Sequence, residues 1–318
     1  MSQVAERWIG LDVGGTKILA VTVDAQLGVL DSRRIATHAH EGPEAVIERM
    51  VDLVSPLLRE ARSPIGGLGV GFAGLVDHQQ GIIESSIILP GWNNVPLADR
   101  LRQALDLDVY VDNDATAAGH GEYQALGSPE GLNMILLTLG TGMGGALLID
   151  GHLHRGSTNM SAEFGNTTID WQGPDCLSGN RGSLNSLASG RALAASAQKK
   201  AELHPDSALA RHEGPIDCEV LAALYPADEI VRDLVDQAAR RIGTGLANLV
   251  QIINPDRISL MGGLCGFGER FLDLIRSEID ARCFAVPARH VELGLARHGD
   301  LTGAIGAAAL ARDGAMQR

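Results

Sequence analysis

Two short segments, far apart in the chain, each place a glycine-threonine turn between two apolar runs. The first, 11–17, reads Leu-Asp-Val-Gly-Gly-Thr-Lys, and the second, 137–145, reads Leu-Thr-Leu-Gly-Thr-Gly-Met-Gly-Gly. Glycine has no Cβ, so such a turn lets backbone N–H groups and a threonine hydroxyl approach a ligand closely. A concavity lined by these donors suits phosphate oxygens. Two such turns facing each other across a cleft would suit the polyphosphate tail of a nucleotide, which favours a phosphoryl-transfer enzyme.

Length, charge and cysteine content limit the classes of protein to which the chain can belong. Its 318 residues are enough for two domains. The net charge of −13 argues against a nucleic-acid partner or an anionic membrane surface. The chain begins without the apolar core of a signal peptide, and no apolar run reaches transmembrane length. Its four cysteines are scattered and form no C-x-x-C pair, so we expect no disulfide scaffold or zinc knuckle.

Apolar periodicity predicts alternating strands and helices along the chain. The expected strands are 8–11, 18–23, 27–35, 68–72, 109–111, 134–138, 145–149 and 258–261, and the expected helices are 43–61, 99–105, 114–125, 229–253 and 301–311. We expect Gly243 and Gly245 to interrupt the long helix. The strand–turn–strand pattern of the N-terminus recurs near residue 140, which indicates a duplication at domain scale. The sequence therefore predicts an α/β protein with two similar lobes and a cleft between them.

Asp12 stands directly before the first turn. A carboxylate there can hold Mg²⁺ next to the phosphates, and the alternative is an ordinary turn aspartate at a strand end. The second glycine-threonine turn favours the magnesium interpretation. The G-x-x-x-x-G-K-[ST] pattern of a P-loop is absent, so Lys17 is not assigned the role of the P-loop lysine.

Asp112, Asn113 and Asp114 come where a predicted strand meets a predicted helix. A carboxylate at such a junction can accept the proton of an attacking hydroxyl, and Asn113 can hydrogen-bond a polyol. The alternative is a helix N-cap, for which asparagine and aspartate are preferred residues. On this segment alone the cap is the favoured interpretation.

Three further segments carry weaker signals. Gly262 and Gly263 follow a predicted strand and would let a base or ribose lie against the backbone, although on this segment alone an ordinary turn is the favoured interpretation. Glu163 and Asn166 offer a carboxylate and an amide for sugar hydroxyls, and the alternative is a loop with Asx-type hydrogen bonds. His152 and His154 have no third metal ligand at a suitable spacing, so we interpret them as surface or structural residues.

In their order along the chain, these segments resemble the ROK (repressor, open reading frame, kinase) family of sugar kinases. The fold of that family belongs to the actin/hexokinase/Hsp70 ATPase superfamily, two-lobed and ribonuclease H-like with a duplicated domain. The matching motifs are 11–17, 69–74, 113–115, 139–145, 163–165, 188–190, 254–256, 262–263 and 303–308. The resemblance implies ATP- and Mg²⁺-dependent phosphorylation of a hexose, usually at the 6-hydroxyl. We place the N-terminal lobe at 1–120, completed by a C-terminal helix at 301–318, and the C-terminal lobe at 121–300.

The resemblance also implies a role for each matching residue. Asp114 would be the general base. The sugar-binding positions would be Asn113, Glu163, Asn166, Asn185 and Gly74. The positions that bind the cofactor would be Asp12 (near the Mg²⁺ ion), Gly14, Gly15, Thr16, Lys17, Thr141, Gly142 and, near the adenosine, Gly262 and Gly263. These roles agree with the interpretation of each segment on its own, and with a reaction that proceeds by positioning and charge neutralisation.

The sequence departs from the family pattern around the sugar site. The family usually has a Gly-His after the sugar-binding glutamate, and that histidine ligates a structural zinc; here the position is Asn166. Of the three thiols in the family's C-x-C-G-x-x-G-C segment, only Cys176 is present. Because a structural zinc needs about four N or S ligands, we expect no zinc, and we expect packing and hydrogen bonds to hold this loop. An acidic residue that usually follows and contacts sugar is Asn185 here.

We therefore expect a glucokinase-like carbohydrate kinase that acts on a hexose or hexose derivative. Three alternatives stay open: an N-acetylhexosamine or amino-sugar kinase, a kinase that uses polyphosphate as donor, and a non-catalytic sugar sensor. A DNA-binding repressor is not expected, because the first predicted strand begins near Trp8 and leaves no room for a helix-turn-helix. The expected protein is soluble and cytoplasmic, and the resemblance implies a homodimer or homotetramer without nucleic-acid or membrane partners.

Overall fold

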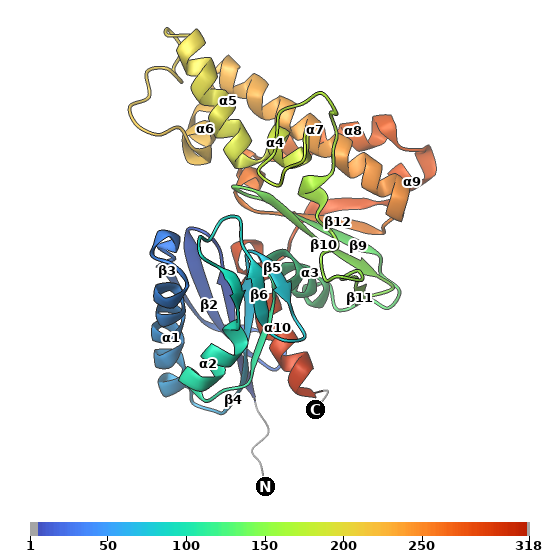
Figure 1. Ribbon diagram of the computed structural model, residues 1–318. Helices are drawn as coiled ribbons and strands as arrows, with labels where there is room; N and C mark the ends of the chain where they lie inside the picture. Colours follow the sequence, from blue (N-terminus) through green and yellow to red (C-terminus); the bar gives the residue numbers. More distant parts are fainter. Residues whose placement is uncertain (1–5, 317–318) are drawn as a thin grey trace. The chain divides into compact units, whose positions relative to one another are not determined.

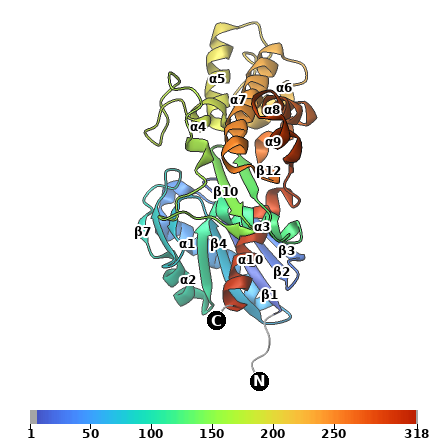
Figure 2. The same ribbon diagram turned by 90° about the vertical axis from the view of Figure 1, so that its right-hand side faces the viewer.

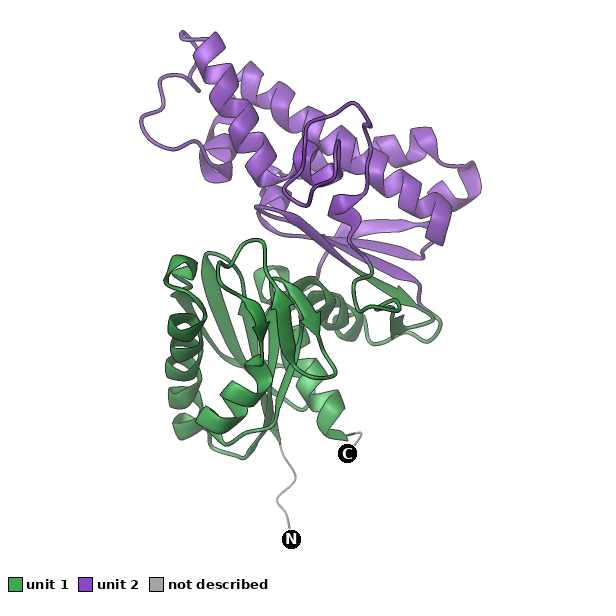
Figure 3. Ribbon diagram, in the orientation of Figure 1, with its two compact units in different colours: residues 1–131, 146–161, 297–318 green, residues 132–145, 162–296 purple. Residues whose placement is uncertain are grey.

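The computed structural model describes residues 6–316, which divide into two compact units. Of the described residues, unit 1 takes in 6–131, 146–161 and 297–316, and unit 2 takes in 132–145 and 162–296, coloured green and purple in Figure 3. The expected C-terminal helix is α10, Thr302–Met316. The last two residues of that expectation, 317 and 318, lie outside the described residues.

Unit 1 is built on a five-stranded sheet with helices on both faces. The strand order is β3-β2-β1-β4-β8, with β1 Arg7–Val13, β2 Lys17–Asp24, β3 Val29–Ala36, β4 Ile65–Phe72 and β8 Val109–Asn113. The first three strands form an antiparallel meander, whereas β4 runs parallel to β1 and to β8. Helices α1 (Pro43–Glu60) and α2 (Leu97–Leu105) cover one face, and α3 (Asp114–Ala125) and α10 cover the other (Figure 1).

Side-chain alternation along β1 explains why both faces of this sheet are covered. Ile9, Leu11 and Val13 are buried in the core that includes α1 and α2. Trp8 is buried in the other core, with the alanine-rich α10. Because successive residues of a strand point to opposite faces, Asp12 shares the α10 face of the sheet with Trp8 and Gly10.

Glycines bring α10 unusually close to the sheet and to α3. A Cβ at Gly69 would lie 1.7 Å from the carbonyl oxygen of Ala307, and one at Gly10 would lie 1.9 Å from that of Ala304. A Cβ at Gly306 would lie 1.8 Å from the carbonyl oxygen of Ala117 on α3. These helices therefore rest backbone to backbone on the strands, which only glycine permits.

Unit 2 repeats the topology of unit 1 in a second five-stranded sheet. Its order is β11-β10-β9-β12-β13, with β9 Met134–Leu139, β10 Met143–Ile149, β11 His152–Leu153, β12 Arg257–Met261 and β13 Glu292–Leu295. If the five strands of each sheet are numbered by their order along the chain, both sheets have the strand order 3-2-1-4-5. Most of β10 and all of β11 cluster with unit 1. The expected internal duplication is thus visible as a repeated sheet.

The helices of unit 2 gather on one side of this sheet (Figures 1 and 2). They are α4 Leu184–Ala188, α5 Gly190–Leu203, α6 Cys218–Leu224, α7 Glu229–Ile253, α8 Glu269–Arg282 and α9 Ala285–His290. The expected interruption of α7 at Gly243 and Gly245 is wrong, because the helix runs unbroken through both. Gly243 instead admits α8, since a Cβ there would lie 2.6 Å from the carbonyl oxygen of Ile275.

A small antiparallel sheet of unit 1 was not expected from the sequence. It consists of β5 Leu75–Asp77, β6 Ile82–Ser85 and β7 Asn93–Val95, in the order β5-β6-β7. These strands have too few residues to display a clear period. Within residues 6–316, no helix combines the length and the apolar character needed to cross a bilayer.

We predict that Gly69→Ala destabilises the protein by about 3 kcal/mol, because the new methyl group must displace the backbone of α10. The measurement is the free energy of unfolding in urea. Gly266→Ala is the matched control, because no atom lies within 4 Å of a Cβ at that position. Equal stability of the two variants would contradict the backbone contact between α10 and β4.

Candidate functional site

The first glycine-threonine turn joins β1 to β2 and is closed by backbone hydrogen bonds. The Gly14 N–H donates to the carbonyl oxygen of Lys17 at 3.0 Å. Thr37 supports the turn from the end of β3: its hydroxyl donates to the Gly14 carbonyl at 2.7 Å, and its N–H donates to that of Thr16 at 3.0 Å. Thr37 is fully buried, whereas Thr16 is exposed. Buried Thr37 therefore holds the backbone of the turn, whereas the side chain of Thr16 is open to solvent.

Asp12 ends near the first turn of α10, in surroundings that oppose its negative charge. A Cβ at Gly303 would lie 2.9 Å from the Asp12 Oδ2 atom, so the missing side chain makes room for the carboxylate. Burial foremost, and then the Asp114 and Asp300 carboxylates, raise the pKa of Asp12 from 3.8 to about 7, although Lys17 acts in the opposite direction. Among the described residues, no hydrogen bond or ion pair engages the Asp12 carboxylate. An unpaired carboxylate beside a second one is a fitting ligand for a hard divalent cation.

Lys17, expected among the cofactor-binding residues, is held by an acidic neighbour. Its Nζ atom lies 3.3 Å from Asp300 Oδ2, and Arg34 Nη2 lies 3.5 Å from the same oxygen. All three side chains are largely solvent-exposed, so these pairs contribute little to stability.

The junction of β8 and α3 carries the candidate base. Asn113 is the N-cap of α3, and its Oδ1 atom accepts from the Thr116 N–H at 3.0 Å. Its amide nitrogen donates to the Gly74 carbonyl at 3.1 Å and to Asp114 Oδ1 at 3.0 Å. The capping interpretation is thus confirmed, and the cap simultaneously orients Asp114. Burial raises the pKa of Asp114, although hydrogen bonds from the Ala115 N–H and from Asn113 act in the opposite direction.

Strand register explains why Asp12 and Asp114 lie close enough to interact. Asp12 pairs with Gly71 on β4, and Gly71 pairs with Asp112 on β8. A Cβ at Gly71 would lie 3.3 Å from the Asp114 Cα atom. The absence of a side chain at Gly71 therefore lets the start of α3 pack closely against β4. The Asp114 carboxylate then lies near enough to Asp12 to raise its pKa.

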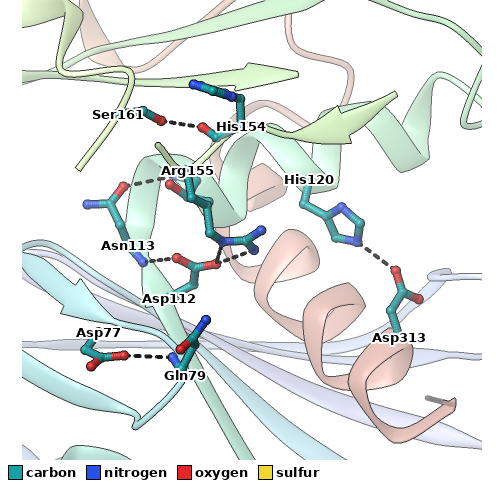
Figure 4. Close-up of polar contacts among 10 residues, drawn as sticks. Asp77, Gln79, Asp112, Asn113, His120, His154, Arg155, Ser161 and Asp313 are labelled. Atoms are coloured by element: carbon teal, nitrogen blue, oxygen red, sulfur yellow. Dashed lines mark hydrogen bonds and ion pairs between the residues drawn. The ribbon is translucent and has the colours of Figure 1, made fainter. Parts of the chain in front are cut away.

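Arg155 was not expected from the sequence and anchors the strand end that carries Asn113 (Figure 4). Its Nη2 and Nε atoms lie 2.7 Å and 3.2 Å from Asp112 Oδ2. The other Asp112 oxygen accepts from the Asn113 N–H at 2.9 Å. Asp112 is buried, so this charge-assisted pair fixes the backbone immediately before Asn113.

The second glycine-threonine turn, between β9 and β10, is held by more partners than the first. The Gly140 N–H donates to the Gly142 carbonyl at 3.0 Å, and the Gly144 N–H donates to the Thr138 hydroxyl oxygen at 2.9 Å. The carbonyls of Gly140 and Thr141 accept from the N–H groups of Gly190 and Arg191, at 2.9 Å and 3.2 Å. The start of α5 therefore supports this turn from the carbonyl side.

Gly262 and Gly263 lie at the end of β12, beside this second turn. Gly262 has φ +105° and approaches β9 so closely that a Cβ would lie 2.5 Å from the Leu139 carbonyl oxygen. A Cβ at Gly263 would meet no atom within 4 Å. Gly262 is thus required by the packing of the strands, and Gly263 leaves open space next to the turn.

Glu163 directly precedes a short 3₁₀ turn, η2 Phe164–Asn166, of which Asn166 is the last residue. The Asn166 amide nitrogen donates to Glu163 Oε2 at 2.9 Å, and the Glu163 side chain is exposed. The pair presents an oriented carboxylate and an amide, which can bind hydroxyl groups of a sugar.

Asn180 closes the loop that follows η2, in the segment where the family pattern has cysteines. Its amide nitrogen donates to the Asn166 carbonyl at 2.6 Å. Its Oδ1 atom accepts from the Arg181 N–H at 2.7 Å and from the Thr168 hydroxyl at 3.2 Å. The described part of the chain contains no group of three or more His, Cys, Asp or Glu residues placed to hold a metal. Hydrogen bonds therefore organise this loop, and the only sequence signal for Asn180 was its place in the altered motif.

The structure thus collects the expected site residues into one group in each unit. Unit 1 brings together Asp12, Gly14, Gly15, Thr16, Lys17, Gly74, Asn113 and Asp114. Unit 2 brings together Thr141, Gly142, Glu163, Asn166, Asn185, Gly262 and Gly263.

Known proteins resemble this chain over nearly its whole length. The model of the ROK family matches residues 8–314. A glucokinase of Streptomyces coelicolor is 34% identical over 315 residues, which cover 96% of this chain and 97% of that protein. An N-acetylmannosamine kinase of Salmonella typhi is 30% identical over 308 residues, which cover 96% and 98%.

A solved structure extends this comparison to the fold. A ROK family glucokinase from Streptomyces griseus, crystallised in complex with glucose and AMPPNP, matches with a TM-score of 0.84 at 30% identity. The match covers 96% of this chain and 99% of that one. The expected two-lobed α/β fold of the actin/hexokinase type is confirmed.

We predict that Asp12→Asn stabilises the metal-free protein, because it removes a charge that the fold disfavours. The folded pKa of about 7 exceeds the ordinary value of 3.8. The folded state therefore binds the extra proton between these two values, and stability falls as the pH rises through this range. The gain should be about 1–2 kcal/mol at about pH 8 and smaller at about pH 5, measured by urea unfolding. A variant less stable than wild type at the higher pH would contradict the unpaired carboxylate.

Proposed function

Because this chain belongs to the ROK family and is a carbohydrate kinase, we propose that it transfers the γ-phosphoryl group of ATP to the 6-hydroxyl of glucose or a closely related hexose. The observation that carries the proposal is the unpaired Asp12 carboxylate beside Asp114, next to a turn built for phosphate oxygens. A phosphoryl-transfer site needs a base for the acceptor hydroxyl and a ligand for the metal that accompanies the nucleotide.

Asp114 is the proposed general base. As the sugar oxygen bonds to the γ-phosphorus atom, its proton passes to the Asp114 carboxylate, and the bond to the β-phosphate oxygen breaks to release ADP. Burial raises the pKa of Asp114, which brings this carboxylate closer to the working pH and makes it a stronger base. Asn113 holds Asp114 Oδ1 at 3.0 Å and the Gly74 carbonyl at 3.1 Å, so the base has a defined orientation.

Asp12 is the proposed residue on the side of the metal ion. Its oxygens suit Mg²⁺, which prefers carboxylate and water ligands, and no other described group hydrogen-bonds or forms an ion pair with them. Mg²⁺ bound with ATP supplies neutralisation of the phosphate charge. The glycine-threonine turns at Gly14–Thr16 and Gly140–Gly142 are the proposed phosphate sites, with backbone N–H groups and the exposed Thr16 hydroxyl as donors.

Glu163 and Asn166 are the proposed sugar ligands of unit 2. The Asn166 amide donates to Glu163 Oε2 at 2.9 Å and so orients a carboxylate, whose oxygens are acceptors for sugar hydroxyls. The 30% identity to an N-acetylmannosamine kinase supports an N-acetylhexosamine as the second candidate substrate. We further propose that units 1 and 2 are the two lobes of a cytoplasmic, homo-oligomeric kinase.

The test is ADP release with Mg·ATP over glucose, mannose, N-acetylglucosamine and N-acetylmannosamine. We expect the highest kcat/KM with glucose, and phosphorus-proton correlation spectra should locate the new phosphate on O6. The matched control is 6-deoxyglucose, which keeps the other hydroxyls and should bind without releasing ADP. Sugar binding by calorimetry without turnover on any sugar would contradict the kinase and indicate a sensor.

A further inference from the structure

Asn185 occupies a position between the two functional turns of unit 2. Its Oδ1 atom accepts from the Met143 N–H at 2.7 Å, and its amide nitrogen donates to the Met143 carbonyl at 3.3 Å. Met143 is the first residue of β10 and directly follows the Gly140–Gly142 turn. One side chain therefore brackets the backbone at the exit of the turn. The aspartate or glutamate side chain could not do this when ionised, because a carboxylate accepts hydrogen bonds but donates none.

The turn that carries Glu163 packs directly against this bracket. A Cβ at Gly165 would lie 2.2 Å from the Met143 carbonyl oxygen and 2.5 Å from the Asn185 amide nitrogen. Gly165 is the central residue of η2, between Glu163 and Asn166. Because no side chain separates Gly165 from Asn185 and Met143, a displacement of η2 must move both of these residues.

Asn185 itself sits on a firmly held element. It is the second residue of α4, whose N-cap Ser183 accepts from the Ser186 N–H at 3.1 Å. The preceding Leu184 N–H donates to the Thr167 carbonyl at 3.0 Å, just beyond η2. These hydrogen bonds restrict the backbone of Asn185. A displacement of η2 is therefore transmitted through the Asn185 side chain to the Gly140–Gly142 turn.

We propose that Asn185 is a positioning residue that couples sugar binding at Glu163 to the shape of the Gly140–Gly142 turn. Sugar that engages Glu163 fixes η2, and the contact through Gly165 and Asn185 then holds the turn in the form that binds nucleotide phosphates. The sequence placed Asn185 among the sugar ligands; in this account its amide acts on the turn instead. The proposal rests on the proposed sugar kinase function. It requires that sugar and nucleotide strengthen each other's binding by the same factor.

The test is calorimetry of sugar and of Mg·AMPPNP, each alone and in the presence of the other. For wild type we expect sugar to tighten nucleotide binding about 10-fold. Asn185→Ala should reduce this factor to below about 2-fold and lower kcat about 10- to 100-fold, with the sugar Kd alone changed less than about 3-fold. Asn185→Asp, which keeps the acceptor and loses the donor, should retain an intermediate factor. Ser186→Ala, on the same helix, is the matched control and should behave as wild type.

Two results would overturn the proposal. A sugar Kd raised 10-fold or more in Asn185→Ala with the coupling factor unchanged would make Asn185 a direct sugar ligand. A coupling factor that is the same in wild type and Asn185→Ala would remove the connection between the turns. Both readouts are binding constants, so they can be measured whether or not the protein phosphorylates a sugar. The proposed function is tested separately, and it fails if wild type phosphorylates no sugar in the panel.

Discussion

The backbone contact of α10 and α3 with the sheet of unit 1 is the constraint on which the candidate site depends. Glycines at Gly10 and Gly69 let α10 approach the strands. In the same layer, Gly303 leaves room beside the Asp12 carboxylate, and Gly71 lets the start of α3, which carries Asp114, pack closely against β4. The two carboxylates therefore interact, and no hydrogen bond or ion pair among the described residues engages that of Asp12. The folded state carries the electrostatic cost of this pair, and the proposed Mg²⁺ ion would reduce it. The buried Asp12 carboxylate beside Asp114 thus both lowers the stability of the metal-free protein and provides the proposed ligand for Mg²⁺.

Unit 2 positions its functional groups with side-chain amides. Asn166 orients Glu163, Asn180 closes the following loop onto Asn166, and Asn185 brackets Met143 after the phosphate turn. An amide can both donate and accept, and the side chains of Asn180 and Asn185 do both at once. The departures from the family pattern are therefore concentrated in one connected part of the structure, where hydrogen bonds hold η2 and the Gly140–Gly142 turn.

Much of this fold follows from local pattern, and the failures have a common physical origin. Both strand–turn–strand units and the cap at Asn113 could be predicted, because apolar alternation and capping chemistry act within a few residues. Arg155, Thr37 and Asn180 were missed because their partners are distant in the sequence and hydrogen-bonding pairs leave no periodic signal. The expected break in α7 was wrong because Gly243 serves a tertiary contact with α8, which overrides its poor helix propensity.

The central claim is that Asp114 takes the proton of the attacking hydroxyl. The measurement that tests it most directly is the comparison of wild type and Asp114→Asn in kcat for Mg·ATP and in sugar affinity by calorimetry. The account predicts that kcat falls about 1,000-fold, whereas the sugar Kd stays within about 3-fold, because asparagine keeps the shape and hydrogen bonding of the side chain but accepts no proton. Turnover within about 3-fold of wild type would contradict the assignment of the base.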